Sequence, residues 1–344
     1  MSENTIVACL GPTAKGAIEI RRISRKKPRA DEIEVAVQAA SVNPIDVRRA
    51  EGYGRRLLSL LGAAKFPMVL GNDFAGTVIA VGTSVRTFKI GDVVYGVKPT
   101  SIEGTHASHV LTKAAHAIPA PEGQDLQLLA AIPYCFVTMW LAVRGAGLTR
   151  QNARGKRVLV HGAAGGLGTL ALQMLSAWGA RVTAITWPSS SAACLDAGAA
   201  EVVDCTNSPF AALTRTFDAT LNFASWEDDL SLVACLRQGA LGHATTVHPM
   251  LRNFDELGWL HGALKTFSEK KRRGNALPNG TKHYAWTLFR PEGAALSELE
   301  ELVRLGHVNL PIGLRKPFEE AAEALDHVRA GRAGRAILYS LETP

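Results

Sequence analysis

The stretch VLVHGAAGGLGTLALQML, from Val158 to Leu175, decides the fold of this chain. A short apolar run leads into a turn with four glycines, and an apolar stretch of helical appearance follows. A strand, a glycine-rich turn and a helix in this order are the context of a dinucleotide site: glycines let the backbone approach a pyrophosphate, and the helix start directs free N–H groups toward it. The spacing is GxxGxxG rather than GxGxxG, so a turn that is glycine-rich only for tight packing is the alternative. The residues expected to hold the cofactor are Ala163, Ala164, Gly165, Gly166, Leu167 and Gly168.

The segments on either side of this stretch follow two different patterns. Up to about Pro121, short alternating runs such as Glu32–Val42 are broken by Gly and Pro, which predicts an antiparallel β domain. From about Leu126, β-rich runs alternate with helical segments, which predicts an α/β fold with a doubly wound parallel sheet of the Rossmann type. The expected parallel strands lie within 157–162, 181–186, 201–205, 218–224, 240–247 and 282–289. The tail is expected to hold a helix at 293–305, a strand at 310–316, a helix at 319–330 and a strand at 335–340.

The run at 282–289 is expected at the edge of the parallel sheet. Because an exposed edge strand is usually paired or covered, we expect a homodimer joined there.

Composition narrows the classes of function. The net charge of +7 is scattered over 344 residues without a basic arm, so nucleic acid is not an expected partner. No stretch reaches ~18 uninterrupted apolar residues, so no transmembrane segment is expected. The five cysteines stand at wide spacings without a CxxC pair, which fits a reducing compartment. Since the first residues show no pattern of a secretory signal or transit peptide, we expect a cytoplasmic protein.

One charged segment stands out. Residues 265–282 contain EKKRRGNALPNGTK, which predicts a solvated surface loop. The alternative is an electrostatic contact with an anionic partner or a membrane surface.

The end of the second parallel strand indicates which dinucleotide binds. An NAD site usually offers Asp or Glu there to the ribose 2′-OH, but Thr186 stands in that place and Ser189 follows it. The missing carboxylate permits a 2′-phosphate, to which Ser189 could donate a hydrogen bond, so we expect NADPH. A plain polar turn is the alternative, since no Lys or Arg stands nearby in the sequence. Arg332 and Arg335 are candidates for reaching the 2′-phosphate, and a surface arginine is the alternative interpretation of each.

Several motifs together resemble a known superfamily. They are SVNPIDVRRAEGYG (41–54), FPMVLGNDFAGTVIAVGTSVRTFKIGDVVYG (66–96), GTHASHVL (104–111), IPYCFVTMWLAV (132–143), GKRVLVHGAAGGLG (155–168) and AGAAEVVD (197–204). They are similar to the medium-chain dehydrogenase/reductase superfamily, in its zinc-free quinone oxidoreductase branch. Within that branch, GTKHYAWTLF (280–289) and the Gly–Tyr–Gly at 52–54 look most like the reticulon-4-interacting protein 1 group. The resemblance covers nearly the whole chain. It implies a GroES-like catalytic domain over 1–128, a Rossmann NADP(H)-binding domain over 129–291 and a return to the catalytic domain over 292–344.

The resemblance also allows a test for metal. Zinc-dependent members carry a Cys where Asn43 stands and a His–Glu pair where Asn72 and Asp73 stand. Catalytic zinc needs about three protein ligands, and Asn is a poor one, so no metal is expected.

Without zinc, neutral donors must hold the negative charge that develops on the substrate oxygen. The resemblance points to Asn43 and Tyr53 as catalytic residues, and an amide N–H and a phenol O–H suit that task. For Asn43 the alternative is a purely structural N-cap, with Pro44 in the first turn and Asp46 bonding back. The resemblance places Thr138 near the nicotinamide, with a core-facing threonine as the alternative. Asn222 and Val247 follow the fourth and fifth parallel strands, at the crevice where cofactors lie.

These observations lead to an NADPH-dependent oxidoreductase that transfers a hydride to a quinone or an α,β-unsaturated carbonyl. Aromatic residues expected around the cleft favour a small hydrophobic substrate; they are Phe66, Phe136, Trp140, Phe254 and Trp259. An enoyl-thioester reductase is one alternative, with the cluster at 270–273 meeting an anionic carrier. The other is an NADP(H)-binding scaffold with little turnover, because Cys205 and the residues at 222–225 depart from the pattern of relatives.

Overall fold

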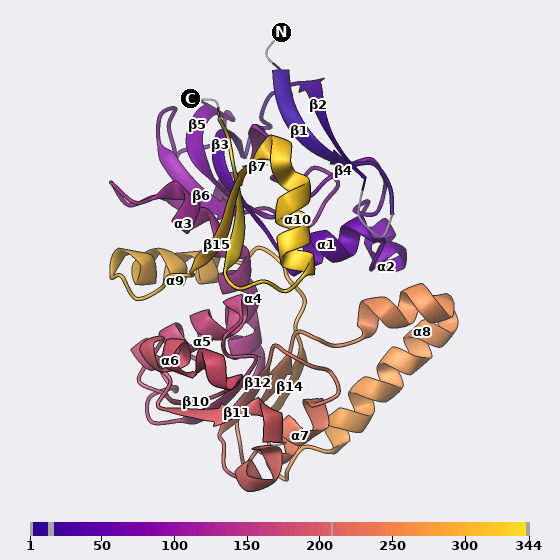
Figure 1. Cartoon of the computed structure of the whole chain (residues 1–344), viewed down its shortest axis with the longest axis vertical. Helices are drawn as coiled ribbons and strands as arrows, with labels where there is room; N and C mark the ends of the chain where they lie inside the picture. Colours follow the sequence, from indigo (N-terminus) through magenta and orange to yellow (C-terminus); the bar gives the residue numbers. More distant parts are fainter. Residues whose placement is uncertain (1–2, 13–16, 208, 342–344) are drawn as a thin grey trace.

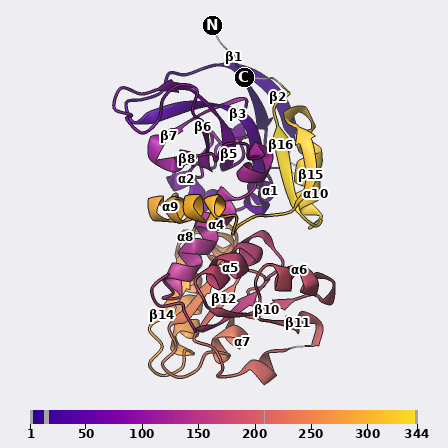
Figure 2. The same cartoon turned by 90° about the vertical axis from the view of Figure 1, so that its left-hand side faces the viewer.

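The computed structural model describes residues 3–12, 17–207 and 209–341. Figure 1 shows two layered halves: a parallel sheet with its helices, and a β-rich half in which the first and last parts of the chain lie together. The same division is visible in the turned view of Figure 2. The expected fold class is therefore confirmed.

The parallel sheet has the strand order β11–β10–β9–β12–β13–β14, and every pairing in it is parallel. Counted along the chain this is the order 3-2-1-4-5-6, whose direction of winding reverses between β9 and β12; ligands bind at such switch points. All six predicted strands are present, with β14 at an edge. Their bounds are β9 Arg157–His161, β10 Arg181–Thr186, β11 Glu201–Asp204, β12 Ala219–Asn222, β13 Gly242–Thr245 and β14 His283–Trp286.

The crossover helices explain why the central strand β9 is apolar and buried in its middle. The sheet has helices on its faces, so Val158, Leu159 and Val160 of the central strand β9 are all fully buried. The helices of this half are α4 Pro133–Gly145, α5 Gly166–Ala177, α6 Ser191–Asp196, α7 Asp229–Ala234 and α8 Met250–Asn275.

The other half is built from both ends of the chain. The predicted strand at 32–42 is β3, which pairs antiparallel with β5, β7 and the C-terminal strand β16. The strands of this half are β1 Glu3–Cys9, β2 Ile18–Ser24, β3 Glu32–Val42, β4 Met68–Val69, β5 Asp73–Val81, β6 Val93–Val97, β7 His109–Lys113, β8 Ala117–Pro119, β15 Ile312–Pro317 and β16 Arg335–Tyr339. The helices are α1 Pro44–Ala50, α2 Arg55–Leu60, α3 Leu126–Ala130, α9 Gly293–Arg304 and α10 Ala321–Arg329. The four elements expected in the tail are thus present within a few residues of their predicted bounds.

Helix α8 corrects the prediction of a solvated loop at 265–282. The helix runs through to Asn275 and is broken once, at Gly258, whose φ of +76° is left-handed. Its second leg folds back on the first: a Cβ atom at Gly262 would lie 2.8 Å from the carbonyl oxygen of Asn253. Figure 1 shows α8 projecting from the side of the molecule. Within the described ranges, no helix is both long and apolar enough to cross a membrane.

Candidate active site

The glycine-rich turn lies at the centre of the switch point, between β9 and α5. Gly162 has a φ of +79°, and a Cβ atom at Gly168 would lie only 2.2 Å from the carbonyl oxygen of Gly162, so both positions require glycine. At Gly165 the nearest atom to such a Cβ is 3.4 Å away, which leaves the surface of the loop open. Since the first N–H groups of a helix have no intrahelical acceptor, the start of α5 is a cradle for an anion. The loop therefore fits a dinucleotide pyrophosphate.

Neighbouring strands place further predicted residues around this loop. The Ala163 N–H donates to the carbonyl oxygen of Ile185 over 3.3 Å, next to Thr186 at the end of β10. On the other side, a Cβ atom at Gly162 would lie 3.0 Å from that of Ala224, in the turn after Asn222. The loop thus lies between the ends of β10 and β12, as the sequence led us to expect.

A buried polar cluster joins this loop to the β-rich half of the molecule. A Cβ atom at Gly166 would lie 3.2 Å from Cys135 Sγ and 3.8 Å from Arg335 Cδ. From there Arg335 Nη2 donates to Asn43 Oδ1 over 2.7 Å and to Ser41 Oγ over 3.0 Å. Arg335 Nε is buried and finds no acceptor among the described residues. Arg335 thus stands beside the helix start with spare donor capacity.

Asp73 is the acidic member of this cluster. Its side chain is fully buried, and it accepts hydrogen bonds from Asn43 Nδ2 at 2.8 Å, from Ser41 Oγ and from the Tyr134 N–H at 2.5 Å. Arg335 Nη2 lies 4.0 Å from Asp73 Oδ2. Burial raises the pKa of Asp73 to about 6, and the arginine and the three donors oppose that rise. Asp73 was not predictable from the sequence as a partner of Arg335, because these residues meet only through the pairing of β16 with β3.

Asn43 has two roles in the structure. Its backbone is the extended N-cap of α1, and its N–H donates to Asp46 Oδ2 over 2.8 Å, as predicted for the helix start. Its side chain is fully buried. The two amide hydrogens face Asp73 at 2.8 Å and Ser41 at 3.2 Å, so the donors that a substrate oxygen would need are already engaged. Its catalytic role remains a prediction.

Tyr53 lies in the loop between α1 and α2. The ring is half-buried, and the guanidinium carbon of Arg48 lies 5.5 Å from the ring centroid. Phe66 and Met68 line the same small hollow as Tyr53. Burial raises the pKa of the phenol above its usual value, against the lowering effect of Arg48, so Tyr53 is neutral at pH 7 and keeps its proton for donation.

The loop of Tyr53 is held from the other half of the molecule. Asp255 in the first leg of α8 accepts from the Gly54 N–H at 2.5 Å and from the Arg56 N–H at 3.0 Å. These groups are at the start of α2, so Asp255 acts as its N-terminal cap from about two hundred positions away. No local sequence signal could have identified this contact.

The remaining predicted cofactor residues occupy different environments. Thr138 donates to the Tyr134 carbonyl oxygen over 2.7 Å within α4 and is nearly buried, which agrees with its alternative as a core-facing threonine. Asn222 is fully buried and organises the turn after β12 by donating to the Ser225 carbonyl oxygen and Asp229. The Val247 N–H donates to Thr245 Oγ1 over 3.3 Å. Their roles at the cofactor stay predictions.

At the end of β10, Thr186 is buried whereas Ser189 is exposed. Between them Trp187 has 63% of its surface exposed, an unusual position for so large an aromatic side chain. Trp187 is not among the residues expected from the sequence at the cofactor site. Its place in the sequence, directly after the second parallel strand, was the signal that would have marked it as a residue at this edge of the sheet.

The aromatic residues expected around the cleft do not form one group. Phe136 is fully buried in the core beside α5, and Trp259 lies on α8 with its edge toward Phe254 at a centroid distance of 5.8 Å. Trp140 lines a separate hollow with Trp286. Of the five, Phe66 shares the hollow of Tyr53. The expectation of a common aromatic lining is therefore wrong, because α4 and α8 direct their aromatic side chains to different surfaces.

The donor set at the position of the catalytic zinc does not fit zinc. Asn43 and Asn72 offer amides, and Asn72 Nδ2 donates to the Lys98 carbonyl oxygen over 2.9 Å. Asp73 is the one carboxylate, and its oxygens already accept hydrogen bonds. In the described part of the chain, no group of three or more His, Cys, Asp or Glu is placed to hold a metal ion.

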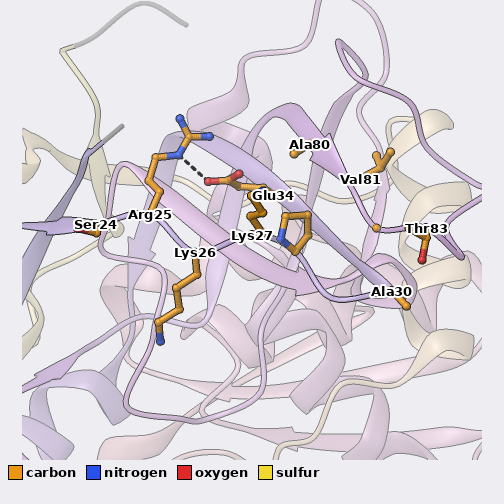
Figure 3. A pocket seen from close by; sticks show the side chains of 11 residues that line it. Ser24, Arg25, Lys26, Lys27, Ala30, Glu34, Ala80, Val81 and Thr83 are labelled. Atoms are coloured by element: carbon orange, nitrogen blue, oxygen red, sulfur yellow. Dashed lines mark hydrogen bonds and ion pairs between the residues drawn. The ribbon is translucent and has the colours of Figure 1, made fainter. Parts of the chain in front are cut away.

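Another hollow lies in the β-rich half, between the segment after β2 and the end of β5 (Figure 3). Two of its three cations are already paired: Arg25 Nε donates to Glu34 at 2.7 Å, and Lys26 Nζ to Glu103 at 2.5 Å. None of the predicted site residues lines it. We therefore place the candidate site at the glycine loop.

Comparisons with known proteins agree with this arrangement. Residues 29–122 match the family described as alcohol dehydrogenase GroES-like domain, and residues 197–336 match the family described as zinc-binding dehydrogenase. The mouse protein named NAD(P)H oxidoreductase RTN4IP1, mitochondrial, is 33% identical over 331 aligned residues, which cover 90% of this chain and 81% of the mouse protein.

Two solved structures show the same fold at low sequence identity. The quinone oxidoreductase from Coxiella burnetii has a TM-score of 0.79 at 21% identity, covering 98% of this chain and 99% of its own. The CurK enoyl reductase has a TM-score of 0.80 at 20% identity, covering 99% of this chain and 100% of its own.

The prediction of a cytoplasmic protein is wrong by this comparison. The mouse relative and its counterparts in cattle and humans are all named as mitochondrial proteins. The absence of a recognisable leader in the first residues was a weak basis for assigning a compartment. The two family matches and the mouse relative, aligned over most of both chains, show together with the fold that this chain belongs to the medium-chain dehydrogenase/reductase superfamily.

Proposed function

We propose that this chain is an NADPH-dependent oxidoreductase that reduces a quinone or an α,β-unsaturated carbonyl without zinc. The observation that carries this proposal is the placement of Arg335, with an unsatisfied Nε, beside the glycine-rich start of α5. Relatives named NAD(P)H oxidoreductase support the cofactor class. When bound, NADPH supplies the hydride, and the protein binds and orients the reactants.

In this proposal the chain binds the pyrophosphate through the N–H groups at the start of α5 and through Arg335, which lies beside Gly166 and is therefore assigned to the pyrophosphate instead of the 2′-phosphate. Asp73 and Asn43 fix the guanidinium, so we assign Asn43 to positioning rather than to direct donation. A direct contact of Asn43 with a substrate oxygen would require breaking its bond to Asp73 or Ser41. Ser189, which is exposed after the end of β10, is the proposed hydrogen-bond donor to the 2′-phosphate.

Tyr53 is the proposed donor to the substrate oxygen. A neutral phenol O–H can donate a hydrogen bond that stabilises the negative charge developing on that oxygen, and it can transfer its proton to the oxygen. Asn43, Asn72 and Asp73 do not form a donor set for zinc. In this proposal the Tyr53 phenol therefore polarises the substrate carbonyl in place of a metal ion. We also propose that the edge strand β14 pairs with its counterpart in a homodimer, which light scattering on the purified chain would test.

The test is a pair of titrations followed by turnover assays. Tighter binding of NADPH than of NADH supports the cofactor assignment, and equal affinities contradict it. NADPH oxidation by 9,10-phenanthrenequinone or a simple enone supports the reaction class. Oxidation by enoyl thioesters alone would identify an enoyl-thioester reductase, and tight binding without oxidation by any acceptor would identify a scaffold.

A further inference from the structure

The second leg of α8, residues 259–275, has an apolar face that no part of the described chain covers. Leu260, Leu264 and Phe267 follow one another at helical spacing and are 69%, 59% and 69% exposed. The opposite face is turned inward: Asn253 Nδ2 donates to Thr266 Oγ1 and to Glu269 Oε2, both over 3.2 Å. The three apolar side chains therefore point away from the protein.

The charges around this stripe are positive. Lys271 continues it one turn after Phe267, and Lys265, Lys270 and Arg272 are exposed on either side. The acidic residue of this leg, Glu269, faces Asn253 and pairs with Lys265 at 3.4 Å. A helix with an apolar stripe flanked by Lys and Arg has the composition of helices that lie in the interface of anionic membranes.

We infer that this leg of α8, with the stripe Leu260–Leu264–Phe267 and the cations Lys265, Lys270, Lys271 and Arg272, docks the protein on an anionic lipid surface. A second copy of the chain fits this face poorly, because antiparallel or parallel pairing of two such helices brings like charges together. An anionic bilayer would bury the apolar stripe at its interface and attract the flanking cations to its head groups.

The place of α8 relative to the candidate site gives this docking a consequence, which rests on the proposed function. The first leg of α8 holds the loop of Tyr53 through Asp255, and the exposed Leu60 and Leu61 lie at the end of the neighbouring helix α2. A membrane beneath α8 therefore lies near the loop that carries the proposed substrate donor. A lipophilic acceptor dissolved in that membrane would reach the site without crossing water.

The test is flotation of the full chain with vesicles of phosphatidylcholine alone or mixed with phosphatidylglycerol. We expect binding to the mixed vesicles, weakened by salt, and at least about tenfold weaker binding to the neutral ones. The variant Leu264→Gln with Phe267→Gln and the variant Lys271→Gln with Arg272→Gln should each lose about tenfold in partitioning. The control Ile90→Gln with Leu195→Gln removes two apolar side chains of comparable exposure elsewhere and should bind like the wild type.

Absence of binding to mixed vesicles would overturn the inference, as would equal binding by all variants. Loss of a dimer on light scattering in the Leu264→Gln, Phe267→Gln variant would also overturn it, and would assign the face to a second copy. Turnover with a water-soluble quinone separates the two proposals, because the α8 variants should keep it. A wild-type protein that binds vesicles but reduces no acceptor would contradict the proposed function alone.

Discussion

Arg335 and Asn43 stand 292 positions apart in the chain, yet Arg335 Nη2 donates to Asn43 Oδ1 over 2.7 Å. The contact exists because the last strand, β16, pairs with β3, which ends at Val42. It brings a cation from the C-terminal strand to the start of α5 in the other half of the molecule.

Replacement of Arg335 should weaken cofactor binding. The variant Arg335→Gln removes the charge beside the helix start, and we expect an affinity for NADPH lower by about ten- to a hundredfold in a fluorescence titration. Because loss of Arg335 leaves Asp73 without its counter-charge, the variant is best compared with the double variant that also carries Asp73→Asn. Arg332→Gln, an exposed neighbour, is the matched control. Unchanged affinity in Arg335→Gln would contradict the assignment.

Cofactor binding should take up protons slightly above pH 6. The pKa of Asp73 is about 6 in the free protein, and a bound pyrophosphate brings negative charge that raises it further. The complex then holds more protons than the free protein in this range. Calorimetric titrations in buffers of different ionisation enthalpy measure the uptake, and the difference between the wild type and Asp73→Asn isolates it from the titration of the 2′-phosphate. Equal proton uptake in both proteins would refute the link.

Tyr53→Phe should lower turnover without altering cofactor affinity. The ring keeps its packing beside Arg48, but the donor to the substrate oxygen is lost, so kcat should fall by about a hundredfold. Steady-state assays with a soluble quinone and an NADPH titration measure the two quantities. A variant with the kcat of the wild type would exclude Tyr53 as the donor.

Asp255→Ala should disturb the substrate end of the site from a distance. Loss of the cap of α2 removes two hydrogen bonds next to Tyr53, so we expect a higher KM for the acceptor and a loss of about 1 kcal/mol in the free energy of unfolding. The affinity for NADPH should stay unchanged. Glu256→Ala changes an exposed acid in the next position and serves as the control. If both variants behave alike, the cap has no role in holding the loop.

Ser189→Asp should reverse the cofactor preference. A carboxylate at this exposed position repels a 2′-phosphate, so the affinity for NADPH should fall by about tenfold while that for NADH is retained. Ser189→Ala distinguishes repulsion from the simple loss of a hydroxyl. A fall of equal size in Ser189→Ala would indicate that the hydroxyl, rather than the absence of charge, selects the cofactor.

The sequence predicted the fold well because its signals are local. Each parallel strand is a short apolar run bounded by turn residues, and the glycines of the turn after β9 are required by the backbone geometry at Gly162 and Gly168. The capping of α1 by Asp46 was also predictable, since all its parts lie within four residues. The helix at 265–275 was missed because its polar sequence resembles a solvated loop and its support comes from Asn253 in the folded-back first leg.

The site was predicted less completely because its geometry depends on distant contacts. Asn43 could be recognised as important, but only pairing with Asp73 and Arg335 reveals that its amide is already engaged. The aromatic residues were grouped by composition, whereas the helices that carry them direct Phe136 and Trp259 to different surroundings. The support of the Tyr53 loop by Asp255 spans about two hundred positions and has no trace in the local sequence.

Helix α2 has no buried residue of its own, and the acid that satisfies its first N–H groups belongs to α8. The stability of α2 therefore depends on contacts with the opposite half of the molecule. The variant Asp255→Ala would be expected to retain the sheets and to lose this one turn-and-a-half of helix. In the intact chain, a fluorescent label at Leu60 would accordingly report the moment at which the two halves meet, and not the folding of either half.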